Sequence, residues 1–206
     1  MPASRAVAAD DWRLELDRDG IQVQTRAVDG WSIRQIRGSA RIAARLPSVV
    51  AVIDDPAAQD RLEERVAQAT IQHRESATRY QLYARLHMPW PVSDRDIVNQ
   101  RQIRQDPTSF VVTITDTALR DAAPRPGNGV VRIVRSTQVW TLTPDGDGVR
   151  AQVTLLSDPN GPLPAALINS MSISTPFKML KALRALAQSP PYALARPAFI
   201  EDPGTR

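Results

Sequence analysis

The chain has 206 residues, enough for one large domain or two small ones with a real hydrophobic core. Its 26 basic and 22 acidic residues give a net charge of +4, too small and too evenly spread to predict nucleic-acid binding. The absence of cysteine excludes disulfides, thiolate catalysis, zinc–thiolate sites and Rieske-type clusters. Only His73 and His87 are histidines, so we expect no metal and no cofactor.

No run of 18 apolar residues is present, so we expect no membrane-spanning helix. The N-terminus has no apolar signal core, which favours a cytoplasmic protein. However, Ala6-Val7-Ala8 resembles the small-residue end of a signal cleavage site, so a periplasmic location stays open. We also expect a monomer.

The first part of the chain predicts three strands and then helices. Residues 12–26 form two short strands around Asp19-Gly20, a dipeptide typical of hairpin turns, and 31–43 form a third. Helical spacing of apolar residues predicts a helix over 44–55, with Pro47 in its first turn, and another over 57–68.

After residue 69 the apolar period drops to two, which predicts six more strands: 70–76, 78–87, 96–105, 109–119, 130–142 and 150–158. A long helix follows over about 162–187, which Asn160 or Gly161 can cap and in which Pro162 suits the first turn. This order indicates an α+β fold with a curved antiparallel sheet that covers its apolar face with the last helix. We divide the chain into an N-terminal extension (1–11), one domain (12–188) and a loosely packed Pro-rich tail (189–206).

Alternation in the strand over 96–105 places one charged side chain inside the sheet. The inward set is Ile97, Asn99, Arg101 and Ile103, and on other strands we expect Tyr80, Leu82 and Trp140 to face the interior. A buried guanidinium is costly unless it finds partners or water. Arg101 therefore either reaches an edge, pairs with a local acid, or presents its charge to a ligand in a hydrated cavity.

The C-terminal helix carries a wide apolar surface, as expected for a helix that lies across a concave sheet. One stripe of it includes Ile168, Met171, Thr175 and Met179. Methionines adapt to flexible apolar ligands, although methionine at helical spacing is also usual in an ordinary core helix. Pro176 lacks the N–H for one helix hydrogen bond and predicts a kink.

Several segments in order resemble the START (steroidogenic acute regulatory protein-related lipid-transfer) family, as a bacterial-type single-domain member. They are 89–98 (PWPVSDRDIV), 129–134 (GVVRIV), 138–144 (QVWTLTP), 155–169 (LLSDPNGPLPAALIN) and 175–184 (TPFKMLKALR). The resemblance covers residues 12–187. It implies a helix-grip fold, in which the sheet wraps the C-terminal helix around one lipid-sized tunnel, without catalysis or a metal.

The resemblance also assigns roles to individual residues. Arg101 falls where family members carry an inward arginine, often paired with an acid on the preceding strand. Residues 78–87 contain no Asp or Glu, so we expect Arg101 to be unpaired and free for an anionic head group, with Asn99 and Tyr80 assisting. The ligand would be a phospholipid, a fatty acid or a sterol-like molecule.

In such a fold, the loop of Met88, Pro89, Trp90, Pro91 and Val92 would lie near the tunnel mouth, against the C-terminal helix. Two prolines would present Trp90 as a fixed apolar tip for a lid or a transient membrane contact; alternatively, Trp90 packs on the last helix. We expect Asp94, Arg95 and Asp96 to pin the loop. Basic residues on the helix (Lys178, Lys181 and Arg184) could add attraction to anionic lipid surfaces.

Two other functions stay open. A helix-grip enzyme, such as a cyclase or hydrolase, would need inward acid–base groups, and only His73 is a histidine expected inside, where a core role is more usual. A sensor that does not transfer its ligand would have the same pocket as a carrier.

Overall fold

The computed structural model describes residues 11–205, without the side chains of Leu167, Met171 and Thr205. The expected N-terminal extension therefore lies outside the described residues, apart from Asp11. In the described part of the chain, no helix is long and apolar enough to span a membrane.

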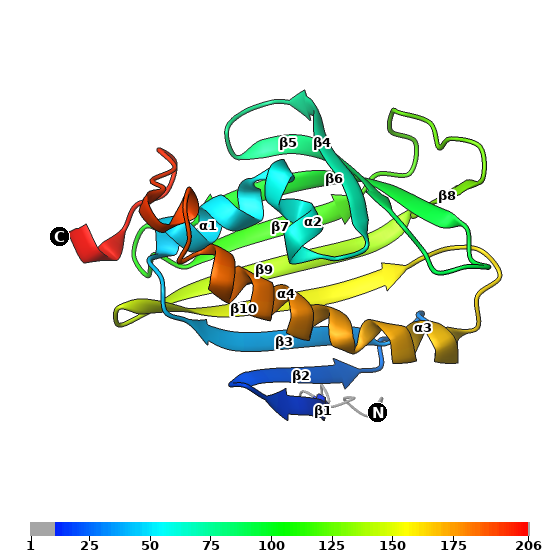
Figure 1. The fold of residues 1–206 in the computed structure, drawn as a ribbon, viewed down its shortest axis with the longest axis horizontal. Coiled ribbons are helices and arrows are strands. Elements are labelled where there is room, and N and C mark those ends of the chain that lie inside the picture. The colour runs from blue at the N-terminus through cyan, green and yellow to red at the C-terminus, as the bar shows by residue number, and fades with distance from the viewer. Residues whose placement is uncertain (1–10, 206) are drawn as a thin grey trace, which may run out of the picture.

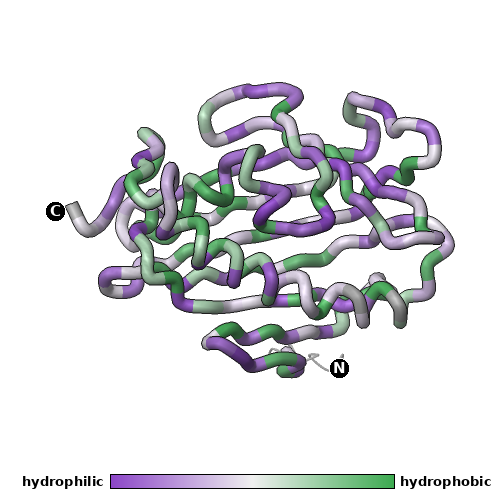
Figure 2. The backbone as a smooth tube through the Cα atoms, viewed as in Figure 1, coloured by the Kyte–Doolittle hydropathy of each residue, from purple (hydrophilic) through white to green (hydrophobic). Residues whose placement is uncertain are grey.

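One large curved sheet forms the body of the molecule, and the helices α1 to α4 lie on one of its faces (Figure 1). The strand order is β1-β2-β3-β10-β9-β7-β6-β5-β4, with antiparallel neighbours, and β8 pairs with β6 in parallel. Hydrophobic and hydrophilic residues alternate along the strands (Figure 2), as expected for a sheet with one face against the core. The strands are β1 (Arg13–Arg18), β2 (Ile21–Arg26), β3 (Gln35–Ile42), β4 (Val66–Arg74), β5 (Arg79–Leu86), β6 (Asp94–Gln105), β7 (Val112–Ala118), β8 (Val130–Arg132), β9 (Arg135–Asp145) and β10 (Gly148–Asp158).

The α+β prediction is confirmed, and so is the first hairpin. Asp19 and Gly20 join β1 to β2 with positive φ angles, the left-handed conformation that a tight hairpin turn needs. The predicted strand over 130–142 is divided into β8 and β9. Two contacts with Asp96 of β6 explain the division. The buried guanidinium of Arg132 binds the Asp96 carboxylate, and the Ile133 backbone N–H donates to the Asp96 carbonyl oxygen. Together they align β8 with β6.

The first helices are shorter than predicted. Helix α1 (Leu46–Asp54) has Pro47 in its first turn, as expected, and a short 3₁₀ turn, η1 (Pro56–Ala58), leads into α2 (Gln59–Leu62). The predicted helix over 57–68 is wrong beyond Leu62, because β4 begins at Val66. Val66 lies opposite Leu86 of β5, so strand pairing overrides the helical pattern of this segment.

The C-terminal helix consists of two pieces, α3 (Ala165–Ser172) and α4 (Ser174–Leu186). Pro176 has no N–H to donate to the carbonyl oxygen of Ser172, so the interruption at Ile173 confirms the predicted disturbance. The predicted start is wrong: α3 begins at Ala165 without a side-chain cap, and Asn160 and Gly161 form a turn with positive φ before it. Gly38 of β3 lets α4 approach closely, since a Cβ there would lie 2.6 Å from the Pro176 Cβ.

The main core lies between the sheet and the helices α1 and α4, and the C-terminal tail belongs to it. Tyr192 of η2 (Tyr192–Leu194) is 4% exposed, and Ile200, just before η3 (Pro203–Thr205), is also buried. The Tyr192 hydroxyl donates to an Asp55 carboxylate oxygen at 2.7 Å, and Ser48 Oγ donates to the Ala193 carbonyl oxygen. The expectation of a loosely packed tail is therefore wrong: the tail seals one end of the core.

Candidate functional site: an apolar cavity under an exposed tryptophan

Two adjoining cavities lie at the end of the interior where α3 meets the sheet. The first has a volume of about 130 Å³ and the second about 90 Å³. Their shared wall consists of Arg65, Ser157, Ile168 and Ser172. Apolar side chains make up much of the remaining wall: Leu86, Met88, Val92, Ile133 and Leu163 around the first cavity, and Ile33, Ile36 and Leu155 around the second.

The loop over 88–92 covers the first cavity. Met88 is buried and lines the cavity together with Val92, whereas Trp90 is 93% exposed. The alternative that Trp90 packs on the last helix is therefore wrong. The loop therefore holds its aromatic tip in solvent, while its two ends, Met88 and Val92, line the first cavity.

Asp94 holds the base of this loop. Its carboxylate accepts hydrogen bonds from Arg85 Nη2 at 2.8 Å and from the Met88 backbone N–H at 3.2 Å, and His87 Nδ1 lies 3.1 Å away. The hydrogen bond from Arg85 is the main reason that the pKa of Asp94 lies below its usual range.

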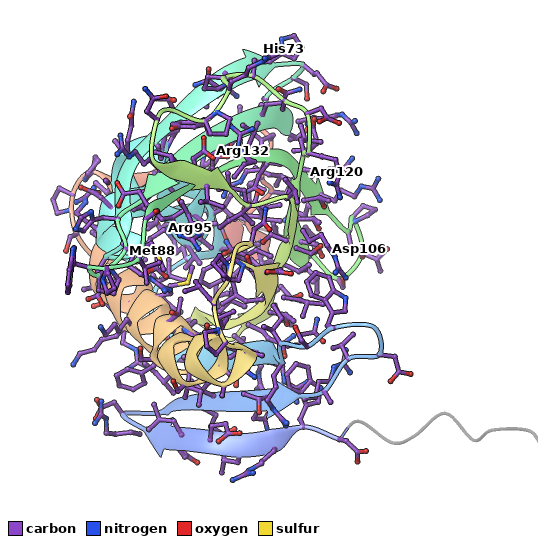
Figure 3. The ribbon with its side chains drawn as sticks, turned by 90° about the vertical axis from the view of Figure 1, so that its right-hand side faces the viewer. His73, Met88, Arg95, Asp106, Arg120 and Arg132 are labelled. Atoms are coloured by element: carbon purple, nitrogen blue, oxygen red, sulfur yellow. The ribbon has the colours of Figure 1, made fainter. Side chains whose placement is uncertain are left out.

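Arg95, which lies near Met88 (Figure 3), and Asp96 bind neighbouring segments, so the prediction that this Asp-Arg-Asp segment pins the loop is confirmed for Asp94 alone. Buried Arg95 donates to the carbonyl oxygens of Pro159 at 2.8 Å and Asn160 at 2.9 Å, and burial lowers its pKa. Asp96 accepts two hydrogen bonds from Arg132, at 2.7 and 2.8 Å. Arg95 also lines the first cavity, which the sequence did not predict.

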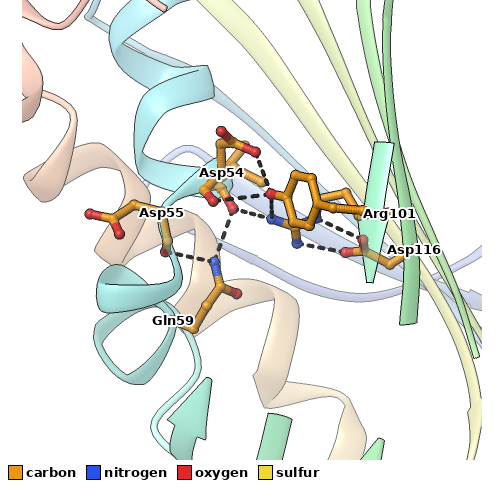
Figure 4. Close-up of polar contacts among 7 residues, drawn as sticks. Asp54, Asp55, Gln59, Arg101 and Asp116 are labelled. Atoms are coloured by element: carbon orange, nitrogen blue, oxygen red, sulfur yellow. Dashed lines mark hydrogen bonds and ion pairs between the residues drawn. The ribbon is translucent and has the colours of Figure 1, made fainter. Parts of the chain in front are cut away.

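Arg101 faces the interior, as predicted, but it is not a free cation. It is 1% exposed, and its Nε and Nη2 donate to both carboxylate oxygens of Asp116 on β7, each at 2.7 Å (Figure 4). The expectation of an unpaired Arg101 is wrong because the acid comes from the strand after β6 instead of the strand before it. Asp116 lies directly opposite Arg101 in the β6–β7 register.

The same cluster ties α1 to the sheet. Arg101 Nη1 donates to the Ile53 carbonyl oxygen at 2.7 Å, near the end of α1, and the Tyr80 hydroxyl donates to the Asp54 carboxylate. Burial raises the pKa of both Tyr80 and Asp54 above their ordinary values. These bonds satisfy most of the polar groups that the interior buries here, so the cluster has the character of a structural clamp.

The remaining predicted tunnel residues do not all reach the cavities. Ile168 and Thr175 line the cavities, whereas Ile103, Trp140 and Met179 are buried in the main core. Leu82 is buried, and Ile97 packs in a small separate cluster. The Asn99 Oδ1 is buried without a hydrogen-bond partner among the described residues, and the side chain of Met171 lies outside them. The open space is therefore shorter than the predicted tunnel, and contact of these residues with lipid stays a prediction.

Two arginines of the cavity wall, Arg65 and Arg34, were not predicted. Arg65 falls in the segment that we predicted to be a helix over 57–68. It lies directly before β4, and the helix prediction gave no reason to place it in a cavity wall. The sequence held one signal for Arg34. It lies two residues before Ile36, which faces inward on β3, and residues two apart along a strand point to the same face.

Other predicted groups lie away from the cavities. His73 is exposed on β4, so the expectation that it faces the interior is wrong. Lys178 pairs with Glu64, and Arg184 donates to the Asp19 carbonyl oxygen at 2.9 Å, so these two cations of the basic helix face have partners within the protein. Within residues 11–205, no group of three or more acidic or histidine side chains is placed to hold a metal.

Comparisons with known proteins agree with this architecture. A solved STAR-related lipid transfer protein fragment from Xanthomonas axonopodis is 34% identical, covers 87% of this chain and 100% of its own, and superimposes with a TM-score of 0.80. An uncharacterized protein of Pseudomonas aeruginosa is 29% identical over 187 residues, 87% of this chain and 88% of the relative. The Zhui aromatase/cyclase from Streptomyces shares the fold at 14% identity, with a TM-score of 0.52 over 75% of this chain and 93% of its own.

The family model of the START domain matches residues 4–191. This match covers nearly the whole chain and includes the proline-bracketed tryptophan, the buried arginine of β6 and the two-piece C-terminal helix. The chain belongs to the START domain family.

Proposed function

We propose that the chain binds one lipid or other hydrophobic molecule between the sheet and the α3–α4 segment, and carries or senses it without catalysing a reaction. The observation that supports this most is the pair of adjoining cavities at α3, the first of which lies under the loop that exposes Trp90. Apolar walls with a few polar groups are typical of small-molecule sites, and the hydrophobic effect supplies about 25 cal/mol for each Å² of apolar surface removed from water.

Binding requires the cavities to widen. Sites for drug-sized ligands have volumes of roughly 300–1,000 Å³, whereas these cavities have about 130 and 90 Å³. The interruption between α3 and α4 at Ile173 provides a place to bend, and Ile168 of α3 lies in the wall that must move. We propose that α3 and the loop over 88–92 move apart to admit the ligand.

The exposed loop supports a transient membrane contact. Pro89, Trp90 and Pro91 are exposed and uncharged, and Met88 and Val92 connect them to the cavity wall. Exposing lipid tails to water costs about 0.8 kcal/mol per methylene, so a carrier has to open against a membrane. The loop would enter the lipid surface beside the place where the cavity opens. We propose that the protein acts as a monomer.

An enzyme of the aromatase/cyclase type is the alternative, because one such protein shares the fold. Two interior acid–base groups that could serve it are Asp54 and Tyr80, whose pKa values burial raises. Both are engaged in the Arg101 cluster, and neither lines the two cavities. The non-catalytic function is therefore the better supported of the two.

Native mass spectrometry of the protein purified from its own host tests the proposal. We expect one co-purifying lipid-like molecule per chain, released unchanged on denaturation. A chain that carries no hydrophobic molecule and converts an aromatic polyketide substrate would favour the enzyme.

A further inference from the structure

The cavity walls have an unusual charge composition. Three arginines, Arg34, Arg65 and Arg95, line them, and none of the other wall residues named for either cavity is an aspartate or glutamate. A cation beside an apolar cavity loses much of its hydration, and an anion placed next to it restores the lost electrostatic stabilisation. Glu63 pairs with Arg65 and offsets only one of the three positive charges, so the walls still favour a ligand with a negative charge.

Arg65 is the central residue of this arrangement, because it lines both cavities. Its Nε donates to the Glu63 carboxylate at 2.9 Å and its Nη2 to Thr175 Oγ1 at 2.7 Å. Its Nη1 has no hydrogen-bond partner within the described part of the chain, and the side chain is 27% exposed. Arg65 thus has donors available at the junction of the two cavities.

Arg34 adds a second cation to the wall of the second cavity. Its Nε donates to the Thr25 hydroxyl at 2.9 Å, and its backbone N–H donates to Asn169 Oδ1 on α3 at 2.9 Å. The side-chain partner is neutral, so the charge of Arg34 is not cancelled by a bound carboxylate among the described residues. Arg95, the third cation, donates to backbone carbonyl oxygens and keeps its charge as well.

We infer that the ligand of this site is an anionic amphiphile and that Arg65, assisted by Arg34, binds its carboxylate or phosphate head group. This inference rests on the proposed lipid-binding function and adds the class of ligand and the recognition residue. Arg101 cannot take this role in the observed arrangement, because hydrogen bonds to Asp116 and to the Ile53 carbonyl oxygen engage all three nitrogens of its guanidinium. Arginine suits the role because its fork of N–H donors matches the oxygens of both anions.

The test compares charged and uncharged ligands with the same tail. A fluorescent polyene fatty acid is titrated beside its methyl ester, and a single-chain lysophosphatidate beside the matching monoacylglycerol. The variants are Arg65→Gln, Arg34→Gln and, as a control, Arg104→Gln, which removes an exposed arginine that lines neither cavity.

We expect wild-type protein to prefer the anion of at least one pair. Arg65→Gln should reduce that affinity about tenfold or more, since a hydrogen bond to a charged group contributes roughly 1.5–3 kcal/mol. Binding of the uncharged partner should stay unchanged, Arg34→Gln should have a smaller effect, and Arg104→Gln should have none. A larger preference for the fatty acid over its ester would identify a carboxylate head group, and a larger preference for lysophosphatidate over monoacylglycerol would identify a phosphate.

Equal losses for the charged and uncharged ligands would overturn the inference and leave Arg65 as a packing residue. Failure of every ligand to bind wild-type protein would instead overturn the proposed function itself. If a variant does not fold, a measurement on wild-type protein still tests the inference. The carboxyl carbon of a bound, ¹³C-labelled fatty acid should titrate at a lower pH than in neutral vesicles; a higher midpoint would contradict the inference.

Discussion

The arginines at the two ends of the interior have different surroundings. We call the end near α1, around Arg101, the closed end, and the end near α3, with the two cavities, the open end. Near α1, Arg101 donates to both oxygens of Asp116 and to the Ile53 carbonyl oxygen, and it lines neither cavity. Near α3, Arg65 and Arg34 border cavities whose walls contain no carboxylate, although Arg65 also pairs with Glu63 outside the wall, at 2.9 Å. The first end is held together by buried hydrogen bonds within the protein, whereas the second borders open space; under the proposed function, the second end is where the ligand binds.

The chain segments around the two ends differ as well. At the closed end, Tyr192 and Ile200 of the tail pack into the core. At the open end, the C-terminal helix is interrupted at Ile173, and Trp90 lies almost fully in solvent. For the lipid uptake proposed above, we expect the end near α1 to act as a rigid base and the end near α3 to open.

The largest expected effect is at the closed end. Arg101→Leu should lower the free energy of unfolding by about 3–5 kcal/mol, because Asp116 would remain buried without its partner. Urea denaturation measures the change. The matched control is Arg79→Leu, which removes one partner of the exposed Glu75–Arg79 pair and should cost about 0–1 kcal/mol. Similar losses for the two variants would show that the Arg101 cluster is not a clamp.

A smaller effect is expected where α4 touches the sheet. Gly38→Ala places a Cβ 2.6 Å from the Pro176 Cβ, so α4 or β3 must shift. We expect a loss of about 1–3 kcal/mol in the free energy of unfolding, as for other overpacked sites. Chemical denaturation and a crystal structure of the variant would test this. A variant as stable as wild type would mean that α4 moves freely relative to β3.

At the open end, Trp90→Ala should affect lipid transfer and leave folding intact. Transfer between vesicles should slow about tenfold if insertion of Trp90 into the membrane contributes roughly 1.4 kcal/mol. Equilibrium binding of lipid should change less, and Trp90→Phe should be mild. Rates and affinities are measured side by side on the same variants. If both fall in step, the loop is part of the binding wall and docks no membrane.

The smallest effect is expected at the helix interruption. Pro176→Ala restores an N–H that can bond to the Ser172 carbonyl oxygen, and one such bond contributes about 1 kcal/mol. A continuous helix should resist opening, so lipid uptake should slow about fivefold. Stopped-flow fluorescence with a lipid probe measures the rate. Faster uptake in the variant would show that α3 does not bend at this point.

The sequence correctly predicted those features of the fold that depend on a few neighbouring residues. Asp19-Gly20 marks its hairpin because few residues adopt positive φ, and Pro47 and Pro176 act through the N–H that proline lacks. The Met88–Val92 loop stood out for its composition, and the structure exposes its tryptophan.

The missed features depend on strand register and on pairing between distant segments. Asp116 could have been considered as the partner of Arg101, since Val112, Ile114 and Asp116 alternate on one face of β7, but only the register places the two side chains opposite each other. Arg65 was hidden because residues 63–68 have a helical pattern that pairing with β5 overrides. No local signal shows either contact.

Hydrogen–deuterium exchange with and without a bound amphiphile tests the central claim most directly. The account predicts slow exchange at the closed end, in Arg79–Leu82, Asn99–Ile103 and Val112–Asp116, whether or not ligand is present. Residues 88–92 and 165–173 should exchange quickly in the free protein and slow down on binding. Protection that instead appears around Arg101, with no change in α3 or the Trp90 loop, would contradict the account.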